Sequence, residues 1–183
     1  MNTFLAGEKV LLRSLEMDDR DLFWKWFADR EVVKYSLSIW LFPWSKEETE
    51  NWLKKTLQDK ETLSLGVVEK TTEQLIGYAG IATMSRINRS GEYYLFLGEK
   101  ESWGKGYGTE ATQLIVQYGF TSLNLNRIML TVSASNIGGI KVYTRAGFQR
   151  EGVLRHALYR DGIYHDSIVM GLLRSEWEAR AER

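Results

Sequence analysis

Three glycines, each separated from the next by one residue, constrain the fold of this chain more than any other sequence feature. Gly104, Gly106 and Gly108 lie in the segment Trp103–Thr109, after a strand pattern over 91–97 and before a helical pattern over 106–122. Alternating glycines let the backbone turn sharply and approach a ligand closely. The first N–H groups of the following helix favour an anion such as a phosphate, and Lys105 adds a positive charge.

The segments after this loop predict a parallel crossover. A nearly continuous apolar run over 127–134 is typical of a strand, and Asn136 is a good N-cap for a helix that ends before Gly147. Two further strands are expected over 148–155 and 163–173, joined by a turn at 160–162. Because a strand, a helix and a second strand in this order require a parallel connection, we predict an α/β (α+β) domain.

The segments before the loop predict two helices and several strands. Ser45 and Glu48 match a capping box that begins a helix at Lys46 and continues it to about Gln58. The stretch 35–44 is aromatic, contains the one proline and fits neither period, so we predict a loop there. The remaining segments are expected to be strands over 9–13, 62–70 and 74–84, a helix over 17–28, and a charged tail over 175–183.

Composition narrows the possible functions. The 183 residues include no cysteine and two histidines, which excludes thiolate catalysis and disulfides and makes a multi-histidine metal site unexpected. Lys and Arg total 24 and equal Asp and Glu, so the net charge gives no bulk attraction to nucleic acid or to an anionic membrane. Because no membrane-length apolar run and no signal-peptide pattern is visible, we expect a single cytoplasmic domain over 1–183.

Motif spacing separates the phosphate-binding alternatives. A P-loop requires a Lys-Ser or Lys-Thr pair after its glycines, and none follows here. A dinucleotide-binding loop requires G-x-G-x-x-G and an acidic residue about 20 positions later, whereas this loop has G-x-G-x-G and the next strand ends without an acid. From the residues alone, another kind of phosphate-binding turn and a turn that holds no ligand both remain open.

A longer series of motifs resembles the GNAT superfamily of N-acetyltransferases. The series comprises Glu92–Leu97, Gly104–Ala111, Tyr118–Phe120, Asn136 and Lys141–Phe148, in this order. It is most similar to the branch that holds the ribosomal-protein N-terminal acetyltransferases and the spermidine N-acetyltransferases, and it extends over residues 10–174. The resemblance implies a mixed, mostly antiparallel twisted sheet of about seven strands with helices on both faces.

The same resemblance implies acetyl-CoA as co-substrate. Backbone groups of Phe96, Leu97 and Gly98 are expected to pair with the pantetheine arm, and the loop amides are expected to bind the pyrophosphate. Because the loop opens with Trp103, where the family usually has Gln or Arg, a side-chain contact to phosphate is expected to be missing. The implied cofactor contacts are the loop residues Trp103, Gly104, Lys105, Gly106, Tyr107, Gly108 and Thr109, together with Asn136, Lys141 and Arg145. For Lys141 and Arg145 a solvated helix face is the alternative.

Acetyl transfer to an amine needs a proton acceptor and a proton donor. An amine with a pKa of about 10.4 is almost wholly protonated at neutral pH, and the departing thiolate benefits from an acid. The resemblance implies Tyr143 as that acid and Glu92 as the acceptor of the amine proton, directly or through water. It also implies the backbone N–H of Leu97 as the oxyanion donor. The residues alone also allow a structural Tyr143 and an exposed, inactive Glu92.

The segment between the first two helices is the expected acceptor site. It carries Tyr35, Trp40 and Trp44, whose ring faces attract cations, and Glu31 lies just before it. The alternative is that these rings cap the core or form a homodimer contact. The sequence leaves the acceptor open between a polyamine, a protein N-terminal amine and an aminoglycoside. A non-catalytic CoA-binding sensor with the same fold is the alternative function.

Overall fold

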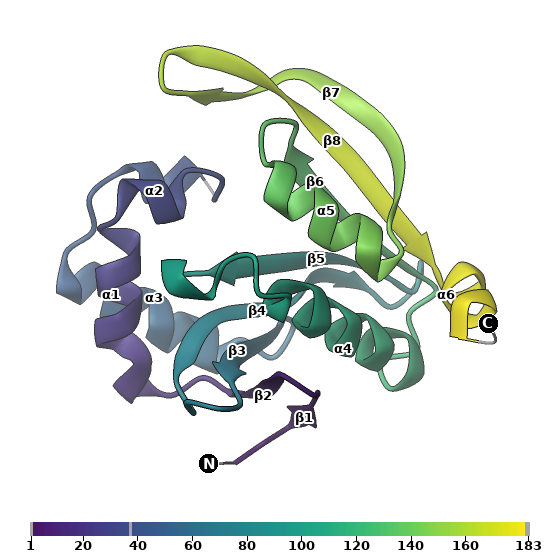
Figure 1. Cartoon of the computed structure of the whole chain (residues 1–183), viewed down its shortest axis with the longest axis horizontal. Coiled ribbons are helices and arrows are strands. Elements are labelled where there is room, and N and C mark those ends of the chain that lie inside the picture. The colour runs from purple at the N-terminus through teal and green to yellow at the C-terminus, as the bar shows by residue number, and fades with distance from the viewer. Residues whose placement is uncertain (1, 37, 182–183) are drawn as a thin grey trace.

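One mixed sheet forms the centre of the molecule (Figure 1). The computed structural model describes residues 2–36 and 38–181, and within these residues eight strands pair in the order β1-β2-β3-β4-β5-β6-β8-β7. Only β5 and β6 are parallel, so the mostly antiparallel sheet predicted from the sequence is confirmed. The strands are β1 (Leu5–Ala6), β2 (Val10–Ser14), β3 (Leu63–Glu69), β4 (Leu75–Ser85), β5 (Ser90–Leu97), β6 (Arg127–Ser133), β7 (Gln149–Arg160) and β8 (Ile163–Leu173).

Helices cover both faces of this sheet (Figure 1). On one face, α1 (Arg20–Phe27) and α3 (Lys46–Gln58) bury an aromatic cluster against β3, β4 and β5. On the other face, α4 (Tyr107–Thr121) and α5 (Ile137–Ala146) bury the larger aliphatic cluster. The shorter elements are η1 (Met17–Asp19), α2 (Arg30–Val33), η2 (Ser38–Leu41), η3 (Lys100–Ser102) and α6 (Arg174–Ala181). Within the described residues, no helix is long and apolar enough to cross a membrane.

The predicted helix ends have the expected local chemistry. The Ser45 side chain accepts from the backbone of Glu48 and the Glu48 side chain accepts from the backbone of Ser45, so the capping box begins α3 as predicted. The Asn136 side chain accepts from the Gly139 N–H at 2.9 Å and caps α5. Gly147 ends α5 with φ of 110°, a left-handed conformation that glycine adopts without steric cost.

Several regions differ from the prediction. The elements β1 and α2 were not predicted, and η2 lies within the segment 35–44 that was expected to be a loop. The expected charged tail forms a helix, α6, because Trp177 packs on Phe120 with ring centroids 5.6 Å apart and anchors an otherwise polar segment. The last two strands are longer than expected at their turn, and β7 and β8 form a long hairpin that arches toward α2 (Figure 1). The register shift after Leu154 introduces a bulge that lets this hairpin bend.

The parallel pair opens into a gap. Strands β5 and β6 pair at three positions, and the last pair is Glu92 with Met129. Beyond this pair β5 continues to Leu97 beside β4, whereas β6 continues to Ser133 beside β8. The two strands therefore separate within the sheet, and the gap between them is open to main-chain contacts from a third partner.

Candidate active site

The main chain of β5 presents hydrogen-bonding groups to this gap. The N–H of Gly98 donates to the carbonyl of Ile76 on β4 at 2.9 Å, which fixes the alternation of the β4–β5 ladder. Phe96 and Gly98 therefore direct their main-chain groups toward β4, and Leu95 and Leu97 direct theirs toward the gap. Of the three residues expected to pair with a pantetheine arm, only Leu97 faces the gap with its main chain.

The glycine loop provides a helix start without a side-chain cap. Gly104 and Gly106 have φ of 77° and 92°, so both occupy the left-handed region that only glycine enters at low cost. Gly106 is the N-cap of α4 and, within the described residues, no side chain caps this end of the helix. The first N–H groups of α4 are therefore available to an anion, and they lie at the positive end of the helix dipole.

Gly108 brings the start of α4 directly over the gap. A Cβ on Gly108 would lie 3.1 Å from a methyl group of Leu95 and 3.4 Å from one of Leu97. On its other side it would lie 3.6 Å from Val142 on α5. The uncapped helix start thus lies between α5 and the β5 residues whose main chain faces the gap. This is the arrangement expected of a pyrophosphate site beside a pantetheine channel.

Side chains from the first turn of α4 hold the loop region to the start of β2 and the end of β3. The carboxylate of Glu110 accepts from the main-chain N–H groups of Lys9 and Val10, at 2.9 and 3.0 Å. The Tyr107 hydroxyl donates to Glu69, and this hydrogen bond lowers the pKa of the Glu69 carboxyl. Thr109 is half-buried in the first turn, while the side chains of Trp103 and Lys105 are exposed.

Tyr143 lies where the two parallel strands begin to part. Its ring is 8% exposed and contacts Tyr93 and Phe148, with ring centroids 6.1 and 6.2 Å away. Tyr93 directly follows Glu92, the last β5 residue paired with β6. Burial raises the pKa of Tyr143 to about 12, and no described residue forms a hydrogen bond with its hydroxyl. The hydroxyl therefore remains protonated at neutral pH and has a free donor.

Glu92 lies at the same level on the opposite face of the sheet. Along β5, Tyr93 belongs to the cluster under α4 and α5, whereas Tyr94 and Phe96 belong to the cluster under α1 and α3. Alternation therefore directs Glu92 to the α1–α3 face. Its side chain is half-buried and accepts a long, 3.5 Å hydrogen bond from Thr83. The candidate acid and the candidate base thus face opposite sides of the opening.

Three cofactor candidates lie on α5. The side chain of Asn136 is used as the helix cap, which confirms its structural role. Lys141 and Arg145 are exposed, one turn apart on the same helix. Their contact with a cofactor phosphate remains a prediction.

The expected acceptor residues separate into two groups. Trp40 is 5% exposed and stacks on Phe27 with centroids 4.6 Å apart, and Trp44 also packs edge-on against Phe27. Trp40 belongs to the buried aromatic cluster and Trp44 is half-buried and packed against it, which fits the alternative that these rings cap the core. Contact of either ring with an acceptor remains a prediction. Glu31 is exposed and bonded to Lys100 at 3.1 Å, and it shares that cation with Asp29, so its charge is only partly compensated.

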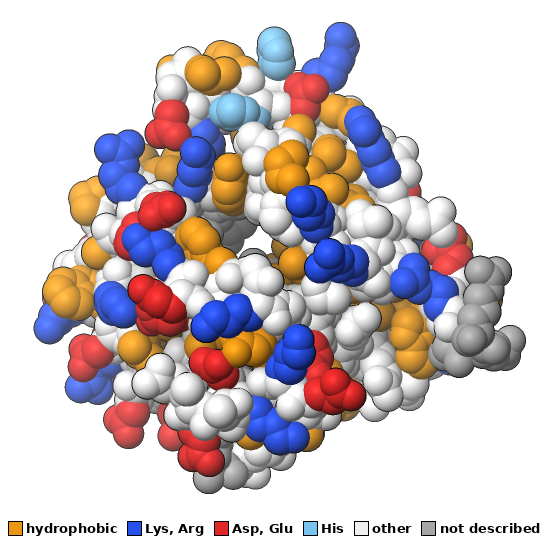
Figure 2. Space-filling view, in the orientation of Figure 1, with side chains coloured by type: hydrophobic (Ala, Val, Ile, Leu, Met, Phe, Trp, Pro, Cys, Tyr) orange, Lys and Arg blue, Asp and Glu red, His pale blue; other side chains and the backbone are white. Residues whose placement is uncertain are grey.

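Tyr35 instead bridges the acceptor segment to the other side of the gap. Its hydroxyl donates to the carbonyl of Ser135, between β6 and α5, at 3.2 Å. Nearby, the Arg160 guanidinium at the tip of the β7–β8 hairpin donates to the carbonyl of Ser36 at 3.0 Å. Figure 2 shows a hollow in this face of the molecule, bordered by the elements that these contacts join. Lys and Arg side chains surround much of the hollow (Figure 2).

Sequence reasoning missed a charged link between the acceptor segment and the cofactor loop. Lys100, in η3, bonds to Asp29 at 2.8 Å as well as to Glu31. Lys25 on α1 bonds to Glu99 in the same way at 3.2 Å. Alternation and motif spacing carry no signal for such pairs, because each joins segments about 70 residues apart.

No group of three or more metal-binding side chains occurs among the residues described.

Comparison with known proteins identifies the family. The acetyltransferase (GNAT) domain model matches residues 9–149. The chain belongs to the GNAT acetyltransferase family. This acetyltransferase is 32% identical over 177 residues to the N-acetyltransferase p20 of Bacillus licheniformis, which covers 94% of this chain and 97% of the relative. It is 30% identical over 177 residues to a spermidine N(1)-acetyltransferase of Vibrio cholerae, with 96% and 99% covered.

Solved structures agree with this assignment. The crystal structure of spermidine N-acetyltransferase from Vibrio cholerae in complex with CoA and spermine superposes with a TM-score of 0.83 at 28% identity, covering 94% of this chain and 99% of that one. A GNAT acetyltransferase from Bacillus anthracis shares the fold with a TM-score of 0.81 at 23% identity, with 94% and 99% covered. The chain is therefore an acyltransferase with the GNAT fold, in a family that uses acetyl-CoA.

Proposed function

We propose that this acetyltransferase transfers the acetyl group of acetyl-CoA to a primary amine by direct attack in a ternary complex. The observation that carries the proposal is the separation of β5 from β6 after Glu92, beside the uncapped start of α4. The gap supplies main-chain partners for an extended arm, and the helix start supplies N–H donors for a diphosphate. No covalent enzyme intermediate is required, and the chain has no cysteine to form one.

The coenzyme supplies an activated acyl group, and the residues around the gap bind it from the α4–α5 face. We assign the pyrophosphate to the loop amides from Trp103 to Thr109, with Lys141 and Arg145 as cationic neighbours. The main-chain groups of Leu95 and the main-chain N–H of Leu97, which face away from β4, support a pantetheine arm laid along β5. The left-handed Gly104 and Gly106 support the close approach of a ligand, since a Cβ on Gly104 would meet no atom within 4 Å.

The opposite placement of Glu92 and Tyr143 supports a division of roles. The amine nitrogen forms a bond to the acetyl carbon while the bond from that carbon to sulfur breaks. Glu92, on the α1–α3 face, accepts the proton that the amine loses, directly or through one water. Tyr143, on the α4–α5 face, donates its phenolic proton to the departing sulfur. A hydroxyl with a pKa of about 12 is fully protonated before the reaction, as an acid must be.

The acceptor is a small-molecule or peptide amine that enters from the α1–α3 face, next to Tyr35. Spermidine acetyltransferases among the relatives support a small amine. The neighbouring acids Asp29 and Glu31 share the single cation Lys100, so one negative charge of this cluster stays uncompensated and can attract a cationic amine. The cluster does not distinguish a polyamine from another small or peptide amine.

A two-step experiment tests the proposal. First, thermal unfolding with millimolar CoA should raise the melting temperature, because a ligand that binds only the folded state stabilises it. Second, release of free thiol from acetyl-CoA should be followed across polyamines, N-terminal peptides and aminoglycosides. A melting temperature that CoA leaves unchanged contradicts the cofactor site. CoA binding without thiol release from any amine favours the non-catalytic alternative.

A further inference from the structure

We propose that Trp103 is a positioning residue: its indole N–H holds the end of β5 so that the Leu97 N–H points at a carbonyl oxygen of acetyl-CoA. The proposal rests on the proposed function, because it assigns a role within the same gap. The proposal is based on one hydrogen bond between the glycine loop and β5. The indole Nε1 of Trp103 donates to the carbonyl oxygen of Leu97 at 3.0 Å.

Both main-chain groups of Leu97 face away from β4. The ladder alternation directs them toward the gap, where β6 no longer pairs with β5. Without Trp103 the Leu97 carbonyl would have no protein partner among the described residues and would be left to solvent or to a ligand, because this contact is exposed. The indole satisfies that carbonyl from within the protein. By the same alternation, the Leu97 N–H points into the gap and not toward β4.

The same short segment is held on its other sides. The N–H groups of Gly98 and Glu99 both donate to the carbonyl of Ile76, at 2.9 and 3.1 Å. Two successive donors on one acceptor are the pattern of a bulge, and the chain leaves β5 at this point. Gly98 packs directly against the indole of Trp26: a Cβ on Gly98 would come within 2.0 Å of that ring. Trp103 thus adds a third contact to the end of β5, which the hydrogen bonds to Ile76 and the packing on Trp26 already hold in place.

These contacts determine which main-chain groups of Leu97 remain available to the coenzyme. With its carbonyl occupied, Leu97 presents a hydrogen-bond donor and no acceptor to the gap. A donor fixed before the ligand arrives costs no reorganisation during the reaction, so it stabilises negative charge on a carbonyl oxygen more effectively than a mobile one. Trp103 supplies its N–H donor from the first residue of the glycine loop, so the loop that carries the helix start also fixes the end of the strand.

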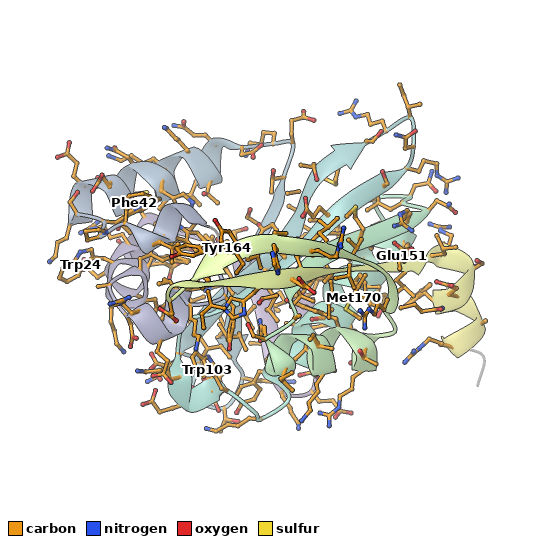
Figure 3. The ribbon with its side chains drawn as sticks, turned by 90° about the horizontal axis from the view of Figure 1, so that it is seen from above. Trp24, Phe42, Trp103, Glu151, Tyr164 and Met170 are labelled. Carbon is orange, nitrogen blue, oxygen red and sulfur yellow. The ribbon has the colours of Figure 1, made fainter. Side chains whose placement is uncertain are left out.

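Two substitutions separate the indole N–H from the aromatic ring. Trp103→Phe keeps a ring and removes the donor, whereas Trp103→Gln keeps an N–H donor and removes the ring. We expect Trp103→Phe to lower kcat/KM for acetyl-CoA about tenfold, the effect of one hydrogen bond, and Trp103→Gln to stay within about threefold of the wild type. Trp24→Phe is the matched control, because Trp24 is also a partly exposed tryptophan and lies well away from Trp103 (Figure 3).

An activity-independent measurement completes the test. Amide hydrogen exchange in the ligand-free protein should be faster at Gly98 and Glu99 in Trp103→Phe than in the wild type or in Trp103→Gln. Equal exchange in all three proteins overturns the proposal, as does equal impairment of both variants, which would assign the effect to the ring. If wild-type protein releases no thiol with any amine, the proposed function fails, and the exchange result still decides whether Trp103 fixes the strand end.

Discussion

At the residue scale, the two side chains that we propose as proton donor and proton acceptor differ in environment, and each difference has a measurable consequence. Tyr143 is enclosed by rings, so its pKa is raised to about 12 and its hydroxyl stays protonated up to about pH 11. Glu92 is half-buried, with one long hydrogen bond to Thr83. A buried neutral donor and a more accessible carboxylate suit an acid and a base respectively.

Tyr143→Phe should lower kcat about 100-fold and leave CoA affinity unchanged, because it removes the proton donor and keeps the ring packing. Steady-state thiol release and a CoA-dependent thermal shift measure the two effects. Because a pKa of about 12 lies above the assay range, Tyr143 should cause no loss of activity between pH 7 and 10 in the wild type. Unchanged turnover in the variant would remove Tyr143 from the reaction.

Glu92→Gln should lower the rate strongly at pH 7 and much less at pH 10. At the higher pH a larger fraction of the amine is already deprotonated in solution, so the need for a carboxylate acceptor declines. The pH dependence of kcat/KM for the amine, compared with that of Glu178→Gln on α6, measures this. A variant whose deficit is the same at every pH would indicate that a water, not Glu92, accepts the proton.

At the scale of elements, helix caps and hydrophobic periodicity predicted most helices and strands. The features that were missed depend on contacts between segments distant in the sequence. The box at Ser45 and Glu48 began α3 as predicted, because both partners lie within four residues of each other. Trp40 entered the core because Phe27, on a different helix, offers a stacking face, and no local pattern contains that information. The Trp103 contact to Leu97 was missed for the same reason, whereas the loop itself followed from its glycines.

The helix start of α4 gives a prediction at this scale. Gly106→Ala should cost about 1 kcal/mol of folding free energy, because φ of 92° is unfavourable for alanine. It should also weaken CoA binding, since the strained residue changes the direction of the first N–H groups. Gly152→Ala in β7 is the control: no atom lies within 4 Å of its added Cβ, and its φ is not in the left-handed region. Thermal unfolding with and without CoA measures both effects, and equal values for the two variants would contradict the role of this turn.

At the scale of the whole molecule, the gap divides a single sheet into two parts that are reconnected at its mouth. The first part carries β1 to β5, and the second carries β6, β8 and β7. The segment after α2 joins them through Tyr35, which bonds to Ser135, and through Ser36, which accepts from the hairpin tip at Arg160. The elements that these contacts join border the hollow in Figure 2, and we propose that the acceptor enters there, so that the contacts position its amine and not the coenzyme.

Tyr35→Phe should therefore raise the KM for the acceptor amine several-fold while leaving the KM for acetyl-CoA unchanged. The substitution removes only the hydroxyl that holds the two parts together at 3.2 Å, and one such exposed hydrogen bond contributes about 1 kcal/mol. Tyr118→Phe, which removes a hydroxyl near the far end of α4, should change neither constant. Initial rates with each substrate varied in turn separate the two KM values. A rise in the KM for acetyl-CoA alone would place this bridge on the coenzyme side and would contradict the entry of the amine beside Tyr35.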